Sequence, residues 1–166
     1  MIKEILKLGN PQLYATSTEY QKEHIKEIEE VVGDLHDTIM EYKRVYGSGR
    51  AIAAPQIGVQ KRLLYMYIDH PIVFINPVLS FPETEMMTVM DDCMSFPGLL
   101  VKVKRYKKCI VDYFDMEWKR RQICLDGDLA ELIQHEYDHL DGILATMRAI
   151  DEKSLFYGDI NDYRNA

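Results

Sequence analysis

Two histidines and a glutamate have a spacing that suits metal-assisted hydrolysis. They lie in the segment His135-Glu-Tyr-Asp-His139. On a helix, side chains four residues apart share one face, so the two imidazoles can bind one divalent metal ion. The metal lowers the pKa of bound water toward about 7. Glu136 can then take up the released proton and pass it to a leaving amine. We therefore interpret the segment as an amide-hydrolysing metal site rather than as a surface helix with two unrelated histidines.

A catalytic site of this kind needs a third protein ligand. No histidine follows this segment, and Glu152 is the only later glutamate. An upstream cysteine is attractive because thiolates bind such metals strongly. Cys109 and Cys124 lie in strand-like patterns and are expected to be small core residues. Cys93 precedes a turn signal, 94–98, so residue chemistry favours it only modestly and leaves an acidic ligand possible.

The segment that carries the histidines is itself predicted to be a helix. Asp128 and Glu131 have the spacing of a capping box. Gly142 stands where a helix commonly ends in a glycine. The apolar face would consist of Leu129, Leu132 and Ile133.

A longer helix and a strand-rich region should surround this metal-binding helix. The long helix is predicted from near Tyr20 to the glycines at 47–49, with a stripe of Ile25, Ile28, Val32, Leu35, Ile39, Tyr42 and Tyr46. Strands are expected at 62–68, at 72–76 (ended by Pro77) and at 85–91. Three further strands, 101–106, 110–116 and 118–125, are expected to form an antiparallel meander. Strands followed by a late helix indicate an α+β fold.

The composition is that of one globular domain spanning residues 1–166. The net charge of −7 argues against a nucleic-acid partner, which would need a basic surface. We see no signal peptide and no apolar run long enough to span a membrane. The three cysteines fit no disulfide framework, so we expect a reducing, cytoplasmic location.

Three segments together resemble the peptide deformylase family. Gly49-Arg-Ala-Ile-Ala-Ala-Pro-Gln56-Ile-Gly58 is similar to its first motif, and Asp91-Asp-Cys-Met-Ser-Phe-Pro-Gly98 to its second. The third is matched by Gln134-His-Glu-Tyr-Asp-His-Leu-Asp-Gly142. The resemblance covers almost the whole chain, in order and at the usual spacing. It implies a peptide-deformylase-like α+β fold, in which a central metal-binding helix packs against antiparallel β-sheets beside the long helix of the N-terminal half.

The resemblance also implies roles for individual residues. The implied metal ligands are Cys93, His135 and His139. Glu136 would serve the attacking water, while the Gln56 side chain and the Met94 backbone N–H would bind the formyl oxygen as charge develops on it. Asp91 is expected to pair with Arg105.

The implied reaction is hydrolysis of the N-formyl group of N-formylmethionyl peptides or nascent proteins, with release of formate. The chain would be a metal-dependent amidohydrolase with one divalent ion, Fe²⁺ by expectation, although Zn²⁺ or Ni²⁺ could occupy the same site. A cysteine-ligated iron site would be prone to oxidation. We expect a monomer that meets its formylated peptide or nascent chain, including at the ribosome.

Several positions depart from the usual motifs. Arg50 and Ala51 replace an aliphatic residue and a glycine of the first motif, Asp91 and Asp92 replace Glu-Gly of the second, and Leu100 replaces a common arginine. The residues expected to bind substrate are Gly49, Arg50, Ala51, Asp92 and Leu132. Arg50 places a charge near the pocket that would take a methionine side chain. We hypothesise that the chemistry is kept and that Arg50 and Asp92 face each other across the cleft and shift the peptide preference. Neutral change at a tolerant rim is the alternative.

The sequence is compatible with two competing functions. The chain could be a zinc peptidase with the general His-Glu-x-x-His motif, which would need another third ligand and a longer substrate groove. It could also be a divergent relative with an altered formyl-amide substrate and weak or no activity. The intact Glu136 and the full set of expected ligands argue against a loss of activity.

Overall fold

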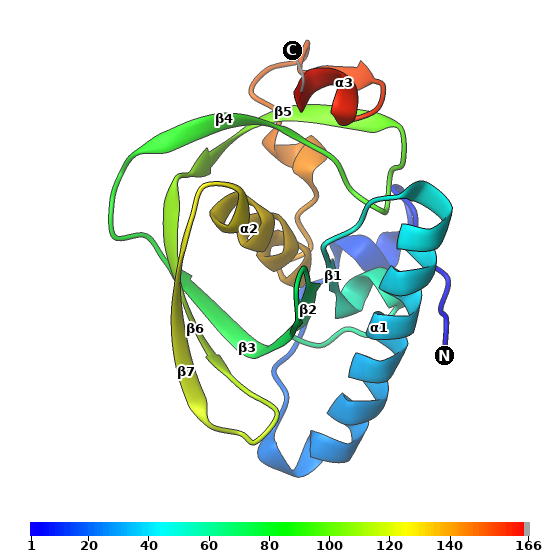
Figure 1. Ribbon diagram of the computed structural model, residues 1–166, viewed down its shortest axis with the longest axis vertical. Coiled ribbons are helices and arrows are strands. Elements are labelled where there is room, and N and C mark those ends of the chain that lie inside the picture. The colour runs from blue at the N-terminus through cyan, green and yellow to red at the C-terminus, as the bar shows by residue number, and fades with distance from the viewer. Residues whose placement is uncertain (165–166) are drawn as a thin grey trace.

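The structure, a computed structural model, describes residues 1–164. In this part of the chain, strands of two antiparallel sheets surround the helix α2, Asp128–Leu140 (Figure 1). The longer helix α1, Ile25–Tyr46, lies on the other side of strands β1 and β2 from α2, and the short helix α3, Asn161–Arg164, lies near β5. The arrangement confirms the predicted α+β fold, with a central helix and a long helix in the N-terminal half.

The larger sheet has five strands in the order β1-β2-β3-β6-β7, and every neighbouring pair is antiparallel. Its strands are β1 (Ala51–Ala53), β2 (Leu63–Tyr67), β3 (Pro71–Ser80), β6 (Lys108–Phe114) and β7 (Arg120–Asp126). The smaller sheet has three antiparallel strands in the order β4-β5-β8. These are β4 (Met86–Asp91), β5 (Leu99–Tyr106) and β8 (Leu155–Tyr157).

The helices α1 and α2 cover opposite faces of β1 and β2. Ile52, Leu63 and Tyr65 belong to a core cluster with residues of α1. Ala53 and Leu64 belong to a second cluster with residues of α2. Successive strand residues point to opposite faces, so both faces of β1 and β2 are buried and their sequences are continuously apolar.

The predicted three-strand meander is wrong, because β5 belongs to the smaller sheet. It pairs with β4 and β8, whereas β6 pairs with β3 and β7. A single residue, Lys107, separates β5 from β6, and its N–H binds the Glu85 carbonyl just before β4. The chain therefore passes from one sheet to the other within one residue, and no turn residue marks this point.

The prediction that Pro77 ends its strand is also wrong, because β3 continues to Ser80. The register shifts between Ile75 and Val78, which indicates a bulge. Asn76 adopts a φ of 49° there, and its side chain binds both the N–H and the carbonyl of Tyr20. A bulge tolerates proline because it removes the need for a ladder N–H.

The helix α1 begins a few residues later than predicted, after a 3-10 turn at Lys22–His24. It ends as predicted, at Gly47 with φ 69°. Most of the expected stripe contributes to the core, but Tyr46 is exposed because it lies in the last turn, beyond the sheet.

The helix α2 begins without the predicted capping box. Gly127 occupies the N-cap position, so Asp128 is already helical, and no side chain caps this end. The other end agrees with the prediction, because Gly142 follows the helix with φ 71°. A Cβ atom there would lie 2.4 Å from the Tyr14 carbonyl oxygen. Glycine is therefore required both by conformation and by space.

The two cysteines outside the cluster with the histidines differ in burial. Cys109 is buried as expected, but Cys124 is exposed, because its position on β7 faces away from the core.

No helix within residues 1–164 has both the length and the apolar character needed to cross a bilayer.

Candidate metal centre and its pocket

The structure brings Cys93, His135 and His139 together in the protein interior. The two histidines lie one turn apart on α2, and Cys93 lies two residues beyond the end of β4. Their candidate ligand atoms all lie within 4.8 Å of one another, and the three side chains are buried. Among the described residues this is the one cluster of histidine, cysteine or acidic groups that could hold a metal ion.

The donor set and its geometry fit a divalent metal. Two imidazoles and one thiolate suit zinc or iron. The Cys93 Sγ and His139 Nε2 atoms lie 3.4 Å apart. Two ligands at zinc–sulfur and zinc–nitrogen distances of about 2.3 and 2.1 Å would be about 3.6 Å apart at a tetrahedral angle. The cluster is therefore able to hold one ion with little rearrangement.

A buried chain of charges orients the first histidine. The Asp91 carboxylate places one oxygen 2.9 Å from His135 Nδ1, and its other oxygen accepts a hydrogen bond of 2.8 Å from Arg105. This confirms the expected pairing of Asp91 with Arg105. Arg105 also donates to Asp138 at 2.6 Å, and Asp138 accepts from Arg148. Such outer contacts fix the orientation of a metal-ligating imidazole.

The electrostatics follow from this arrangement. Burial alone would raise the pKa of Asp91, but the charges of His135 and Arg105 outweigh it and lower that pKa to about 2. Burial would lower the pKa of His135, yet Asp91 and Cys93 raise it well above its usual value. Burial and the neighbouring His135 both lower the pKa of His139. Asp91 therefore stays ionised and compensates positive charge at the centre.

Glu136 lies beside the cluster with one carboxylate oxygen uncommitted. Its Oε2 atom is buried and has no protein hydrogen-bond partner among the described residues. Burial raises the pKa of Glu136 to about 7, and the charge of His135 lowers it by less. A carboxylate with this pKa can both accept and donate a proton near neutral pH.

Gln56 contacts Cys93 of the cluster, and Met94 follows Cys93 in the chain. Gln56 is fully buried in the 3-10 turn Ala54–Ile57 after β1, and its Oε1 accepts from the Ala53 N–H at 2.9 Å. This bond directs Nε2 toward the centre, 3.5 Å from Cys93 Sγ and 3.1 Å from Ser95 Oγ. The Met94 N–H has no acceptor within residues 1–164.

Comparison with known proteins agrees with this geometry. A family model described as "Polypeptide deformylase" matches residues 2–154. The peptide deformylase of Dictyoglomus turgidum is 35% identical over 156 residues, covering 93% of this chain and 97% of that protein. The chain belongs to the peptide deformylase family.

Solved structures of the family have the same fold. The peptide deformylase from Thermotoga maritima matches with a TM-score of 0.83 and 27% identity, covering 91% of this chain and 99% of that one. The peptide deformylase from Synechococcus elongatus, solved in complex with actinonin, matches with a TM-score of 0.82 and 28% identity, covering 90% and 80% of the two chains. The chain is therefore a hydrolase that removes the N-formyl group from N-formylmethionyl peptides, the activity for which the family is named.

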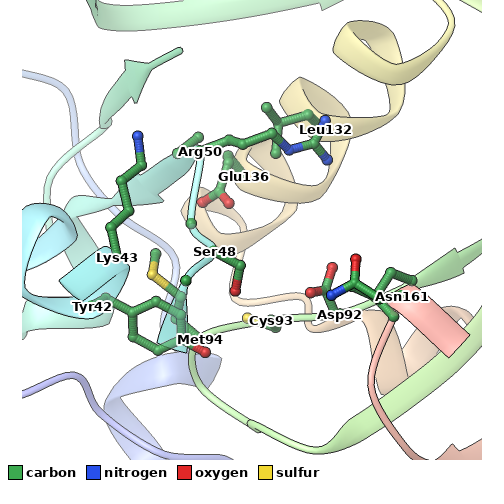
Figure 2. A pocket seen from close by; sticks show the side chains of 14 residues that line it. Tyr42, Lys43, Ser48, Arg50, Asp92, Cys93, Met94, Leu132, Glu136 and Asn161 are labelled. Carbon is green, nitrogen blue, oxygen red and sulfur yellow. The ribbon is translucent and has the colours of Figure 1, made fainter. Parts of the chain in front are cut away.

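The deformylase centre opens into a cavity of about 380 Å³. All five residues expected to bind substrate line it: Gly49, Arg50, Ala51, Asp92 and Leu132. Cys93, Met94 and Glu136 line the same cavity, so the expected reacting groups and the expected substrate wall share one space. Figure 2 shows Glu136 projecting into this cavity from α2, with Cys93 nearby.

Arg50 and Asp92 both line this cavity and lie apart from each other in it (Figure 2). The Arg50 side chain extends toward α2, near Leu132, and binds Glu131 at 3.3 Å. Sequence reasoning did not find Glu131 as part of the site, because 81 residues separate it from Arg50.

The C-terminal segment also contributes to the cavity. Ile160 and Asn161 line it, and Figure 2 shows Asn161 next to Asp92. The strand β8 brings this segment to the site by pairing with β5, with Leu99 opposite Tyr157. The sequence offered no signal for this role, because the tail alternates polar and aromatic residues without a motif.

Proposed function

We propose that this deformylase holds one Fe²⁺ ion on Cys93, His135 and His139 and uses Glu136 as its acid–base group. The observation that carries the proposal is the buried cluster of one cysteine sulfur and two imidazoles beside the uncommitted Glu136 carboxyl group. Zn²⁺ and Ni²⁺ suit the same donors, so the preference for iron is an expectation to be tested. The bound ion supplies Lewis acidity and makes hydroxide available at neutral pH.

The protein groups around the ion have complementary tasks. Glu136 accepts a proton as water attacks the formyl carbon, and it then donates that proton to the departing amine nitrogen. Gln56 Nε2 and the Met94 N–H donate hydrogen bonds to the formyl oxygen as negative charge develops there. Asp91 holds His135 in position, and Arg105 holds Asp91.

We further propose that residues 1–166 act as one domain and as a cytoplasmic monomer that meets formylated nascent chains at the ribosome. The absence of a disulfide framework from the sequence and its ordinary globular composition support this setting. Light scattering should give a molar mass near 19.4 kDa. A mass twice as large would refute the monomer.

The activity is tested by formate release from N-formylmethionyl peptides under anaerobic conditions. Separate samples are loaded with Fe²⁺, Zn²⁺ or Ni²⁺, and a fourth sample is treated with a chelator. We expect formate from the loaded samples, fastest with Fe²⁺, and none from the chelated sample. No formate with any of the three metals would refute the proposal.

The metal ligands are tested by Cys93→Ala, with Cys124→Ala as a matched control at an exposed cysteine. We expect Cys93→Ala to lose bound metal and activity together, and Cys124→Ala to keep both. Full metal content in Cys93→Ala would instead favour a peptidase-type site with another third ligand.

A further inference from the structure

An ion pair stands in the wall of the cavity where an apolar pocket would be expected. The Arg50 Nη2 and Glu131 Oε1 atoms lie 3.3 Å apart. The Arg50 side chain is 31% exposed, whereas that of Glu131 is 13% exposed. Arg50 lines the cavity and Glu131 does not, and the ion pair holds the Arg50 guanidinium against α2 at the cavity wall.

The position of this pair relative to the reacting groups determines what it can contact. Arg50 lines the same cavity of about 380 Å³ as Cys93 and Glu136. In Figure 2 the Arg50 side chain passes beside Leu132 on the helix that carries Glu136. A formyl group bound between Glu136 and Cys93 is joined to the side chain of the formylated residue through only the amide nitrogen and Cα. That side chain therefore enters the same cavity that Arg50 lines.

The chemistry of the guanidinium then decides which side chain fits. A guanidinium has five N–H donors. Within residues 1–164, its bond to Glu131 is the one hydrogen bond that the Arg50 side chain makes. An apolar side chain packed against it would exclude water from the remaining donors without replacing their hydrogen bonds, which costs free energy. A side chain that ends in oxygen acceptors would satisfy them.

We propose that Arg50 selects N-formyl substrates whose formylated residue ends in acceptor oxygens, a carboxamide or a carboxylate, over an apolar residue of equal length. Glu131 acts as a positioning residue that holds the guanidinium at the cavity wall. This inference rests on the proposed formyl-hydrolase function and adds the chemical class of side chain that the site prefers.

The kinetic test compares N-formyl tripeptides that differ only in the formylated residue: glutamine, glutamate or norleucine. We expect kcat/KM for both oxygen-bearing peptides to exceed that of the norleucine peptide by about tenfold or more. In the double variant Arg50→Leu/Glu131→Leu, which replaces the ion pair by apolar groups, the order should reverse. A wild-type preference for norleucine, or an unchanged ratio in the double variant, would overturn the proposal.

A matched control replaces a similar ion pair elsewhere. Lys107 and Glu85 also lie 3.3 Å apart, in exposed positions just after β5 and just before β4, and neither lines the cavity. Lys107→Leu/Glu85→Leu should keep the wild-type ratio among the three peptides. An equal change of the ratio in this control would show that loss of any ion pair alters selectivity and would overturn the specific role of Arg50.

The role of Glu131 is tested separately. Glu131→Leu should raise KM for the glutamine peptide by a larger factor than KM for the norleucine peptide. Glu131→Gln, which can still accept a hydrogen bond from Arg50, should have a KM for the glutamine peptide close to that of the wild type. Equal losses of kcat on every peptide, with no recovery in the Glu131→Gln variant, would indicate a merely structural role. That result would refute the proposal that Glu131 positions Arg50.

A binding measurement separates this inference from the proposed function. Calorimetry with the metal-loaded Glu136→Gln variant gives Kd for the same three peptides without turnover. Tighter binding of the glutamine and glutamate peptides supports the inference even if no enzyme form releases formate, an outcome that would refute the function alone. Tighter binding of norleucine would refute the inference even in an active enzyme.

Discussion

Asp91 connects the proposed metal ligands to the rest of the protein. Its two carboxylate oxygens contact His135 and Arg105, and Arg105 extends the chain of charges to Asp138. All of these groups are buried, so removing one of them leaves its partner without compensation. The network thus fixes one imidazole of the centre through residues of β4, β5 and α2.

Replacing Asp91 should therefore weaken the metal site without removing a ligand. We expect Asp91→Asn to lower the affinity for Zn²⁺ by about 10–100-fold. The Asp91 carboxylate both orients His135 and raises the basicity of its imidazole, and asparagine would lose both effects. Competition with a chromophoric chelator measures this affinity. Asp126→Asn, an exposed change at the end of β7, is the control. Unchanged affinity in Asp91→Asn would show that the contact is not functional.

The two cysteines outside the cluster should differ in reactivity, although the sequence made them look alike. Burial raises the pKa of Cys109 to about 11, so at pH 7 it holds very little thiolate and is also shielded from reagents. Cys124 is exposed. In the native protein, iodoacetamide should modify Cys124 first, as peptide mass spectrometry would show. Faster modification of Cys109 would contradict the placement of β6 and β7.

The chemistry of individual residues in the sequence identified part of the site. His135, Glu136 and His139 followed from their spacing on a helix, but Cys93 and Gln56 depended mainly on family resemblance. Glu131 could not be predicted, because its contact with Arg50 joins residues far apart in the chain. Such contacts depend on how α2 packs beside the start of β1, which no local pattern encodes.

Among the elements, α2 depends on a glycine at its C-terminal end to bring the chain back against Tyr14. Two glycines, Gly142 and Gly33, allow this requirement to be tested with the same substitution. Gly33 is exposed within α1, and an added Cβ would meet nothing within 4 Å. At Gly142 the φ of 71° and the Tyr14 carbonyl at 2.4 Å both oppose a side chain.

We expect opposite effects on the free energy of unfolding. Gly142→Ala should lower it by more than about 1 kcal/mol, because alanine is strained at positive φ and collides with the backbone. Gly33→Ala should raise it by about 0.5–1 kcal/mol, because alanine favours the helix. Urea unfolding followed by circular dichroism measures both. A neutral Gly142→Ala would contradict the close approach of the chain after α2.

The positions of the helices and strands were predicted better than the pairing of the strands. All the predicted strands and both long helices form, since hydrophobic periodicity is local and strong. The assignment of β5 to the smaller sheet was missed, because alternation predicts a strand and says nothing about its neighbour. The continuation of β3 past Pro77 was missed because it depends on a bulge held by Asn76 and Tyr20.

For the whole molecule, the proposed metal ion should contribute to stability as well as to chemistry. Its ligands come from α2 and from the segment just after β4, so binding requires the folded arrangement of helix and sheet. A ligand that binds only the folded state stabilises it by about 2.7 kcal/mol at 100 times its Kd. Metal should therefore raise Tm, and a chelator should reverse the increase.

Calorimetry of metal-loaded and chelated protein measures this stabilisation. The Cys93→Ala variant should show a much smaller difference between the two states, whereas Cys124→Ala should behave as the wild type. An equal metal-dependent shift in Cys93→Ala would place the ion elsewhere.

The proposed mechanism depends most directly on Glu136 acting beside a bound ion. The decisive measurement is formate release by metal-loaded Glu136→Gln, with metal content determined on the same sample. Glutamine keeps the size of the side chain but cannot carry the proton, so we predict full metal content and a rate lower by about 10²–10⁴-fold. A variant that keeps its metal and releases formate at the wild-type rate would contradict the proposed role of Glu136.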